Sequence, residues 1–318
     1  MIVCEASGIR VRTIDAGRLW LDGGAMFGVV PKPLWSRRIP ADERNRIQLS
    51  MRCLLVETGG LRVLVDTGLG NKEDDKFLDI YGVENDGRPT RLEDSLRAAG
   101  VEPGEVDVVV CTHLHFDHAG GSTTLGEDGL IRPSFPNARY VIRRGEWDFA
   151  HERNERVRAS YMSKHFDPLA EAGQVELVDE DVEVAPGIRV VRTAGHTPYH
   201  QSVLVEAGDQ TVFFPVDLAP TSAHLPLPWI MGYDVEPLVT LESKREWLTR
   251  AGSEGWLMVF SHDPGVAAGV ARPREGRDGC ELAEPRSDGA DTLGADASDG
   301  EAVGEPRKDS DNDGQDEG

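Results

Sequence analysis

Short apolar runs alternate with turn-forming residues along most of the chain, and this pattern predicts many β-strands with helices between them. Residues 51–57 and 61–66 are apolar runs on either side of a Thr-Gly-Gly sequence, which predicts a β-hairpin. Residues 91–99 have the periodicity of a helix that ends at Gly100. Residues 106–111 form a continuous apolar run, as expected for a buried strand.

Further apolar runs continue this pattern towards the C-terminus. We predict strands at 138–142, 174–178, 188–192, 201–205, 211–214 and 256–260. A helix is predicted after Pro237, with Leu238, Leu241 and Leu248 on one face and Gly252 at its end. Strands in this number with helices between them predict an α/β (α+β) fold of two packed sheets covered by helices.

The composition changes sharply near residue 271. Residues 272–318 hold 15 acidic and six basic residues, no aromatic residue, and many Gly, Ser, Asp and Pro. Such a segment buries too little apolar surface to offset the entropy of ordering it. We therefore predict one domain over 1–271 and a disordered acidic tail over 272–318.

The whole chain is acidic, with 56 acidic residues against 34 basic ones and a formal net charge of −22. A surface of this charge repels phosphate backbones, which argues against nucleic-acid binding. No apolar run reaches the roughly 18 to 20 residues that a membrane helix needs, and the N-terminal residues do not resemble a secretory signal. We therefore expect a cytoplasmic protein that binds neither nucleic acid nor membrane.

The basic residues and the cysteines add two expectations. Only six of the 34 basic residues are lysines, and an acidic, lysine-poor chain is typical of a halophile-like protein kept soluble in concentrated salt. A GC-rich genome would also favour arginine, so both explanations stay open. The four cysteines are far apart and form no CxxC pair, which predicts reduced, mostly buried thiols.

The strongest chemical signal follows the predicted strand 106–111. It is an HxHxDH sequence formed by His113, His115, Asp117 and His118, with two glycines after it. Imidazole nitrogens and a carboxylate suit Zn²⁺ and related divalent ions. Residues two apart at the end of a strand point the same way, so His113 and His115 can hold one ion, and the two residues on the turn can reach a second position. The sequence therefore predicts a metal site.

Three more candidate ligands follow later predicted strands. His196 comes after 188–192, Asp217 after 211–214, and His262 after 256–260. Each lies next to glycine or proline turn residues, which places all three along one edge of the sheets. Alone, each of them is more simply a structural residue, but beside an HxHxDH sequence we interpret them as ligands.

These residues, in this order, resemble the metallo-β-lactamase-fold hydrolases, and Asp66-Thr67-Gly68 matches an early motif of that family. The resemblance covers roughly residues 9 to 266. It implies a four-layer αβ/βα sandwich of two mixed sheets with two divalent metals at one edge. By this resemblance the ligands of the first metal are His113, His115 and His196. The ligands of the second are Asp117, His118 and His262. Asp217 would bridge the two metals and Asp66 would orient a ligand.

The segment 22–32 and the Leu-Trp that follows it resemble the N-terminal loop of the quorum-quenching lactonase branch and its methyl-parathion-hydrolase relatives. This resemblance implies substrate contacts from Met26, Phe27 and Trp35, which the residues alone would allow equally as core or loop anchors. Well-known lactonases of that branch carry a tyrosine three positions after the bridging Asp, where this chain has Pro220. His224 and Tyr233 are the candidates to replace it.

The resemblance implies a dinuclear metal-dependent hydrolase, and we expect an N-acyl-homoserine-lactone-like lactonase that opens an ester ring with a metal-bridging hydroxide. Asp117 and Asp217 are the expected catalytic carboxylates. The expected cofactor is two divalent ions, with zinc first and manganese, iron or cobalt as alternatives. An organophosphate triesterase or arylesterase, a glyoxalase-II-like thioesterase, an iron-dependent sulfur dioxygenase and a metal-stabilised module without turnover stay open. The substrate is expected to be a small ester or lactone, and a homodimer stays open.

Overall fold

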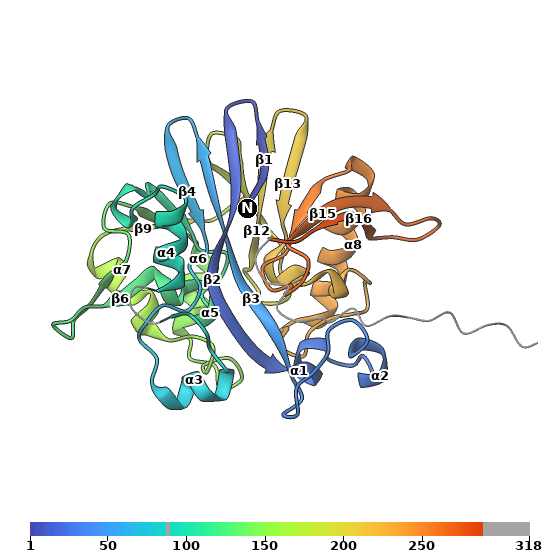
Figure 1. Ribbon diagram of the computed structural model, residues 1–318, viewed down its shortest axis with the longest axis horizontal. Coiled ribbons are helices and arrows are strands. Elements are labelled where there is room, and N and C mark those ends of the chain that lie inside the picture. The colour runs from blue at the N-terminus through green and yellow to red at the C-terminus, as the bar shows by residue number, and fades with distance from the viewer. Residues whose placement is uncertain (87–89, 289–318) are drawn as a thin grey trace, which may run out of the picture. The chain divides into compact units, whose positions relative to one another are not determined.

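The structure is a computed structural model that describes residues 1–86 and 90–288 (Figure 1). Its first sheet has seven strands. In spatial order they are β1 (Ile2–Ala6), β2 (Ile9–Asp22), β3 (Arg46–Thr58), β4 (Leu61–Val65), β5 (Val108–Val110), β8 (Arg139–Arg143) and β9 (Val175–Val178). β1 to β4 pair antiparallel, whereas β4, β5, β8 and β9 pair parallel. The carboxyl ends of the parallel strands therefore lie along one edge.

The second sheet also has seven strands. In spatial order they are β10 (Val182–Ala185), β11 (Ile188–Arg192), β12 (Gln201–Ala207), β13 (Gln210–Phe214), β14 (Leu257–Val259), β15 (Ala268–Pro273) and β16 (Cys280–Arg286). Only β13 and β14 pair parallel, and the other pairs are antiparallel. A separate two-stranded ribbon is formed by β6 (Thr123–Leu125) and β7 (Ile131–Pro133).

Eight α-helices accompany the sheets in the described residues. They are α1 (Gly23–Phe27), α2 (Lys32–Trp35), α3 (Asp75–Tyr81), α4 (Arg91–Ala98), α5 (Phe116–Ala119), α6 (Arg144–His151), α7 (Asp167–Glu171) and α8 (Pro237–Glu254). α4 begins with a capping box, in which the Thr90 hydroxyl accepts from the Glu93 amide and the Glu93 carboxylate accepts from the Thr90 amide. Within the described part of the chain, no helix is both long and apolar enough to cross a bilayer.

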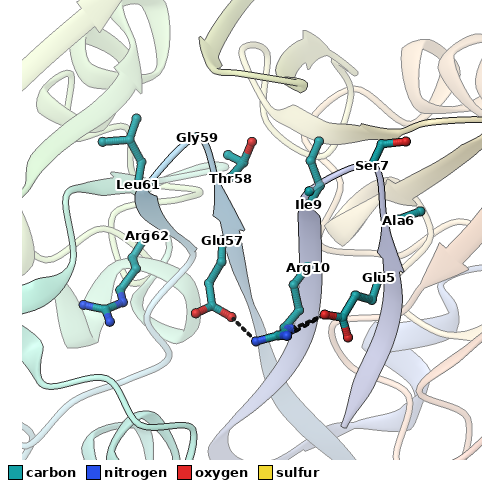
Figure 2. A pocket seen from close by; sticks show the side chains of 12 residues that line it. Glu5, Ala6, Ser7, Ile9, Arg10, Glu57, Thr58, Gly59, Leu61 and Arg62 are labelled. Atoms are coloured by element: carbon teal, nitrogen blue, oxygen red, sulfur yellow. Dashed lines mark hydrogen bonds and ion pairs between the residues drawn. The ribbon is translucent and has the colours of Figure 1, made fainter.

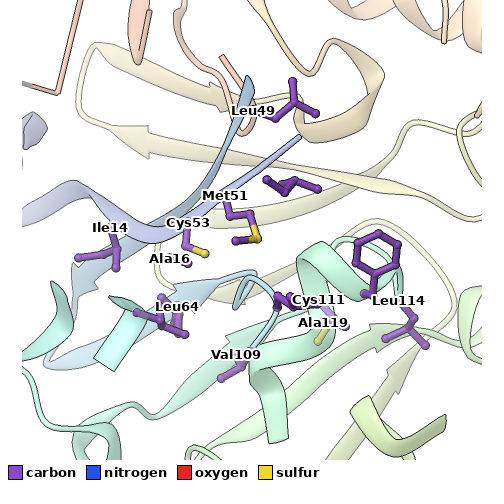
Figure 3. Close-up of a cluster of buried hydrophobic side chains, with 14 of the residues drawn as sticks. Ile14, Ala16, Leu49, Met51, Cys53, Leu64, Val109, Cys111, Leu114 and Ala119 are labelled. Carbon is purple, nitrogen blue, oxygen red and sulfur yellow. The ribbon is translucent and has the colours of Figure 1, made fainter. Parts of the chain in front are cut away.

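Three apolar layers hold these elements together. Between the sheets, valines of β4 and β5 pack against valines of β11, β12 and β13. On the outer face of the first sheet, Ile14, Met51 and Leu64 pack against Leu114 and Ala119 around α5 (Figure 3). On the outer face of the second sheet, a third cluster packs against α8. The order helix, sheet, sheet, helix confirms the predicted αβ/βα sandwich.

The buried face of α8 differs from the prediction. Leu238 is 78% exposed, whereas Thr240, Lys244, Leu248 and Ala251 are buried. The helix begins at Pro237 and continues to Glu254, past the predicted end at 252. Its first turn lies against the loop at Gly195, and Thr240, not Leu238, packs against that loop. This contact involves a distant segment, which helical periodicity alone does not reveal.

The predicted domain boundary at 271 falls inside β15. The chain then turns and returns as β16, which pairs with β15 and buries Cys280. The Asp288 carboxylate reaches back to β3 and pairs with Arg52 at 2.7 Å. The described domain therefore ends at 288, because a few well-placed side chains anchor a segment whose average composition is polar. The rest of the predicted tail, 289–318, lies outside the described residues.

Candidate metal centre

One hollow of the described surface lies away from the predicted ligands. It measures about 670 Å³ and lies between the tips of the β1–β2 and β3–β4 hairpins (Figure 2). Its charged residues neutralise one another, since Arg10 pairs with Glu5 at 2.5 Å and with Glu57 at 3.6 Å. No predicted ligand lines it. Figure 1 shows these tips at the opposite end from α1 and α3, which flank the second cavity described below.

The seven predicted ligands all lie in segments that follow strand ends. The HxHxDH sequence begins three residues after β5, and its second half forms α5. The loops after β11, β13 and β14 bring the other three. Gln201 of β12 joins the sheets here, since its amide donates to the Thr112 carbonyl at 3.1 Å and its side chain to the Cys111 carbonyl at 2.9 Å. The structure therefore brings together residues up to 149 positions apart in the sequence, from His113 to His262.

The ligand atoms form three overlapping groups, within each of which all atoms lie within 4.8 Å of one another. These groups are His113, His115 and His196; His113, His118 and Asp217; and Asp117, His118 and His262. Asp217 faces both ends of this arrangement. Its Oδ2 lies 3.2 Å from His196 Nε2, and its Oδ1 lies 3.2 Å from His262 Nε2. One carboxylate thus reaches two histidine clusters with different oxygens.

The imidazoles of His118 and His262 face each other at a distance that two neutral rings of this tautomer disfavour. The Nε2 atoms of His118 and His262 are 3.0 Å apart. The Nδ1 of His118 faces the Asp66 carboxylate at 2.9 Å, and the Nδ1 of His262 faces the Ser50 carbonyl at 2.7 Å. Since both of these partners only accept, each Nδ1 carries a proton, and in a neutral ring the Nε2 then presents a lone pair. Two lone pairs at 3.0 Å repel unless a cation lies beside them.

A second histidine pair has the same spacing. His196 Nε2 lies 3.0 Å from His115 Nδ1, and the other nitrogen of His196 faces the Asp234 carboxylate at 2.9 Å. His113 Nε2 and Asp217 Oδ1 are buried polar atoms without a hydrogen-bond partner in the described residues. Buried groups of this kind are costly unless a partner satisfies them. The donor set therefore fits two divalent cations, one at each pair.

Burial and neighbouring charges prepare these groups to bind cations. Burial, together with the surrounding imidazoles, lowers the pKa of His113 and of His115 well below the usual value, so both rings are neutral. Burial opposes the charge of Asp217, but the imidazoles of His118, His262 and His196 outweigh it and hold its pKa well below the usual range. His113 and His115 therefore offer unprotonated nitrogens, and Asp217 offers an ionised carboxylate. Burial opposes the charged form of His118 and of His196 as well, but the neighbouring carboxylates outweigh it and raise the pKa of both rings.

Asp66 lies behind the ligands, where the sequence resemblance implies it. Its carboxylate accepts from His118 Nδ1, from the Thr112 amide and from the Thr112 hydroxyl, each at 2.9 Å. Its backbone has a φ of +59°, an uncommon conformation that directs the side chain into the site. The Thr112 hydroxyl also lies 3.1 Å from His113 Nδ1. This network fixes the orientation of two rings at once.

Two buried carboxylates near the ligands were not predicted from the sequence. Asp234, 2% exposed, orients His196 as described above. Glu146 of α6 is fully buried and accepts from the Leu114 amide at 3.0 Å, the Tyr161 hydroxyl at 2.9 Å and the Thr197 hydroxyl at 2.6 Å. Burial raises the pKa of Glu146. These contacts join the loops of His113–His118 and His196, and no spacing in the sequence signals them.

A cavity of about 140 Å³ opens above the ligands. His115, Asp117, His196, Asp217 and His262 line its floor. Its walls are mostly apolar or aromatic. They comprise Leu21, Met26, Leu49, Tyr81, Phe116, Val157, Met231, Gly232 and Tyr233, together with the polar Arg156 and Ser160. Of the five predicted substrate contacts, Met26 and Tyr233 line this cavity.

The other three predicted contacts, Phe27, Trp35 and His224, do not line it. They are fully buried behind it, where the Phe27 ring stacks between His224, at 4.6 Å, and Trp35, at 5.3 Å. Both nitrogens of His224 are occupied, one by the Thr221 hydroxyl and one by the Met26 carbonyl, at 2.8 Å each. The aromatic signal in this segment therefore marks packing, and His224 cannot replace the missing tyrosine at Pro220.

Lys244 of α8 supports the same wall from behind. Its side chain is fully buried, and its ammonium donates to the carbonyls of His224 at 2.7 Å, Pro226 at 2.9 Å and Trp229 at 2.7 Å. The three N–H groups of a lysine thus meet three acceptors. Since Met231 and Tyr233 follow directly in this loop, Lys244 holds one side of the cavity in place.

The comparison with known protein families agrees with this geometry. The model of the metallo-β-lactamase superfamily matches residues 52–262, more than half of the chain. The chain belongs to this superfamily. The match includes all seven ligands and Asp66. It identifies the protein as a hydrolase of this superfamily whose His/Asp clusters suit a dinuclear metal site.

Similar proteins include several lactonases. The N-acyl homoserine lactonase of Bacillus thuringiensis is 28% identical over 227 residues, which cover 68% of this chain and 82% of the lactonase. The lactonase AttM of Rhizobium radiobacter is 28% identical over 187 residues, or 57% of this chain and 67% of AttM.

Solved structures share the fold. A probable metal-dependent hydrolase from Staphylococcus aureus has a TM-score of 0.80 and 29% identity, covering 88% of this chain and 99% of that protein. AidC, a dizinc quorum-quenching lactonase, has a TM-score of 0.72 at 19% identity, covering 89% and 96%. At that identity the likeness to AidC concerns the fold alone.

Proposed function

We propose that this protein is a dinuclear metal-dependent hydrolase that opens lactone rings of the N-acyl-homoserine-lactone type. The observation that carries the proposal is the pair of facing imidazoles at each end of Asp217, beneath a mostly apolar cavity. The similarity to N-acyl homoserine lactonases over most of both chains supports the substrate class. A quorum-quenching role follows if the natural substrates are signalling lactones.

In this proposal the seven ligands divide between two cations. His113, His115 and His196 would hold the first, and Asp117, His118 and His262 would hold the second. Asp217 would be shared between the two. When bound, such ions polarise a carbonyl group and lower the pKa of water enough to supply hydroxide near neutral pH. Zinc suits these ligands best, and manganese, iron and cobalt would also be accepted.

The protein's own side chains would position the substrate and move the proton. The reacting carbonyl would lie on the cavity floor, while Met26 and the other apolar wall residues contact the substituent and exclude water. Tyr233 lines the same wall and is the remaining candidate to assist the carbonyl oxygen in place of Pro220. Asp117 lies on the floor beside His118 and His262, at 3.6 Å from each Nε2, and would pass a proton to the leaving oxygen.

A hydrolysis screen on purified protein, with metal content measured in parallel, tests this proposal. The panel contains N-acyl homoserine lactones of several chain lengths, a plain alkyl lactone, an aryl ester, a thioester and an organophosphate triester. We expect fastest turnover on the lactones and about two equivalents of divalent metal. Turnover of the other esters without the lactones would overturn the lactonase assignment, and absence of any hydrolysis with a full metal complement would overturn hydrolysis itself.

An organophosphate triesterase or arylesterase is the second candidate. It is favoured by Pro220, which stands where the lactonase branch has its tyrosine and whose carbonyl accepts from the His262 amide at 3.0 Å. This contact gives Pro220 a structural role and removes the hydroxyl expected of a lactonase. The triester and aryl ester in the same panel decide between the two.

We also propose that the protein works in the cytoplasm at high salt concentration. A homodimer stays open as its assembly, and light scattering would measure the oligomeric state. The net charge of −22 and the excess of arginine over lysine support the high-salt setting. Thermal unfolding measured at rising KCl concentration tests it. We expect the melting temperature to rise with KCl because the ions screen repulsion between carboxylates. A fall on adding KCl would count against this setting.

A further inference from the structure

One positively charged side chain, that of Arg156, lies in the wall of the cavity above the predicted metal ligands. Arg156 belongs to the loop that follows α6, and it lines the cavity together with Val157 and Ser160 of the same loop. It is the only arginine or lysine among the described residues that line this cavity. Because its side chain is exposed, it lies at the rim, above a floor made of histidines and aspartates.

The guanidinium of Arg156 is only partly engaged. Its Nη2 donates to the Gly232 carbonyl at 2.9 Å and approaches the Asp234 carbonyl at 3.5 Å. No carboxylate in the part of the chain that the structure describes pairs with it, and its Nε and Nη1 have no hydrogen-bond partner there. A guanidinium has five N–H donors in a rigid plane, so one edge is tethered and donors remain for another acceptor.

The position of these donors fits a particular part of a substrate. In the proposed reaction the carbonyl would lie on the floor, and the substituent of the ring would then extend past wall residues such as Met26, Leu49 and Met231 to the rim. An apolar wall satisfies a plain alkyl chain, but it leaves a carbonyl oxygen on the substituent without a donor. The wall residues that can donate to such an oxygen are Arg156, Ser160, Tyr81 and Tyr233, and Arg156 is the one that carries a charge.

We infer that Arg156 is a specificity-determining residue that binds a carbonyl oxygen on the substituent of the substrate. It thereby favours lactones and esters with an acyl-amide substituent over those with a plain alkyl chain. This inference rests on the proposed ester or lactone hydrolysis and adds the chemistry of the group next to the ring. The tether to Gly232 holds the guanidinium at the rim, which limits the entropy lost when it binds the substrate.

The test compares two lactones in steady-state kinetics, an N-acyl-amino lactone and a lactone with an alkyl chain of equal length. Arg156→Met is expected to raise KM for the amide-bearing lactone about 10-fold or more, the usual effect of losing a hydrogen bond from a charged group. KM for the alkyl lactone is expected to stay within about 2-fold. Arg156→Lys is expected to fall between, since lysine keeps the charge without the planar fork.

The matched control is Arg158→Met, which removes the same charge from an exposed residue that does not line the cavity. It is expected to leave both KM values unchanged. Equal losses on both lactones in Arg156→Met would overturn the inference, because they would assign Arg156 only a tether role for the Gly232 loop. Unchanged KM on both would overturn it as well. If the unmodified protein hydrolyses neither lactone, the proposed function fails first and the inference falls with it.

Discussion

Asp234 holds the imidazole of His196 from 38 residues further along the chain, with Oδ1 2.9 Å from Nδ1. His196 in turn directs its Nε2 to within 3.0 Å of His115. The backbone makes the same connection, because the Val235 amide donates to the His196 carbonyl at 3.1 Å. The cavity wall and one end of the metal site therefore share a single loop. A substitution that displaces this loop would also displace His196.

Asp234→Ala is expected to weaken metal binding at the His196 end by about 10- to 100-fold, since carboxylates that orient ligating histidines commonly have effects of this size. Chelator competition on the purified protein measures it. Asp209→Ala, a change at an exposed turn, is the control. Activity is expected to recover in part with excess metal. An unchanged metal affinity would show that Asp234 does not act through His196.

His118→Ala and Asp217→Ala are expected to lower kcat by more than about 100-fold, because a direct ligand contributes more than the residues that orient it. Far-UV circular dichroism is expected to stay that of a folded chain. Metal analysis should find fewer bound ions than in the unmodified protein. His151→Ala removes an exposed histidine outside the site and serves as control. Near-normal turnover in both ligand variants would refute a dinuclear centre.

Lys244→Met is expected to lower the free energy of unfolding by at least about 2 kcal/mol, because it leaves three buried carbonyls without a donor. Denaturant unfolding measures this loss. Lys76→Met, at an exposed position in α3, should change stability by less than about 0.5 kcal/mol. Equal effects of the two substitutions would mean that the carbonyl contacts of Lys244 do not stabilise the fold.

Acid is expected to destabilise the protein partly through His224. Burial, aided by the ammonium of Lys244, lowers the pKa of His224 to about 3 from its ordinary 6.5. Between these values the unfolded chain binds a proton that the folded chain does not. The stability from this group is therefore complete above pH 6.5 and falls by about 1.4 kcal/mol per pH unit as the pH drops towards 3.

His224→Gln keeps a donor for the Met26 carbonyl but removes the titrating group. Unfolding free energies measured from pH 7 to pH 4 should therefore fall less steeply in this variant. His165 and His200 are also buried, with pKa values lowered to about 4 and about 3, and they contribute to the slope that remains. The same slope in the variant and in the unmodified protein would contradict the assignment to His224.

The sequence by itself determined the fold of two packed sheets covered by helices, and it indicated the candidate metal ligands. Apolar runs predicted most of the strands, and each candidate ligand directly follows one of these runs. These are local signals, because a strand followed by a polar turn is written in consecutive residues. The positions of these residues after predicted strands therefore indicated which side chains lie together at one edge of the sheets.

The longest strand, β2, was not predicted from the sequence, and the reason is also local. β2 (Ile9–Asp22) contains charged residues and a bulge between Asp15 and Arg18 that interrupts its alternation. Gly17 makes this bulge possible with a φ of +112°, and its position against the Glu84 carbonyl leaves no room for a side chain. Pairing with β3 over most of its length, not the pattern of its own residues, stabilises it as a strand.

Only the tertiary structure decided what supports the site and what faces the substrate. Asp234, Glu146 and Lys244 act on partners 15 to 51 residues away in the sequence. Arg156 reaches the cavity from a loop without regular pattern. Phe27 and Trp35 looked like substrate contacts, yet both are buried, with the Phe27 ring stacked between Trp35 and His224. Burial and hydrogen bonding depend on which segments come into contact after folding. The order of residues along one segment does not indicate those contacts.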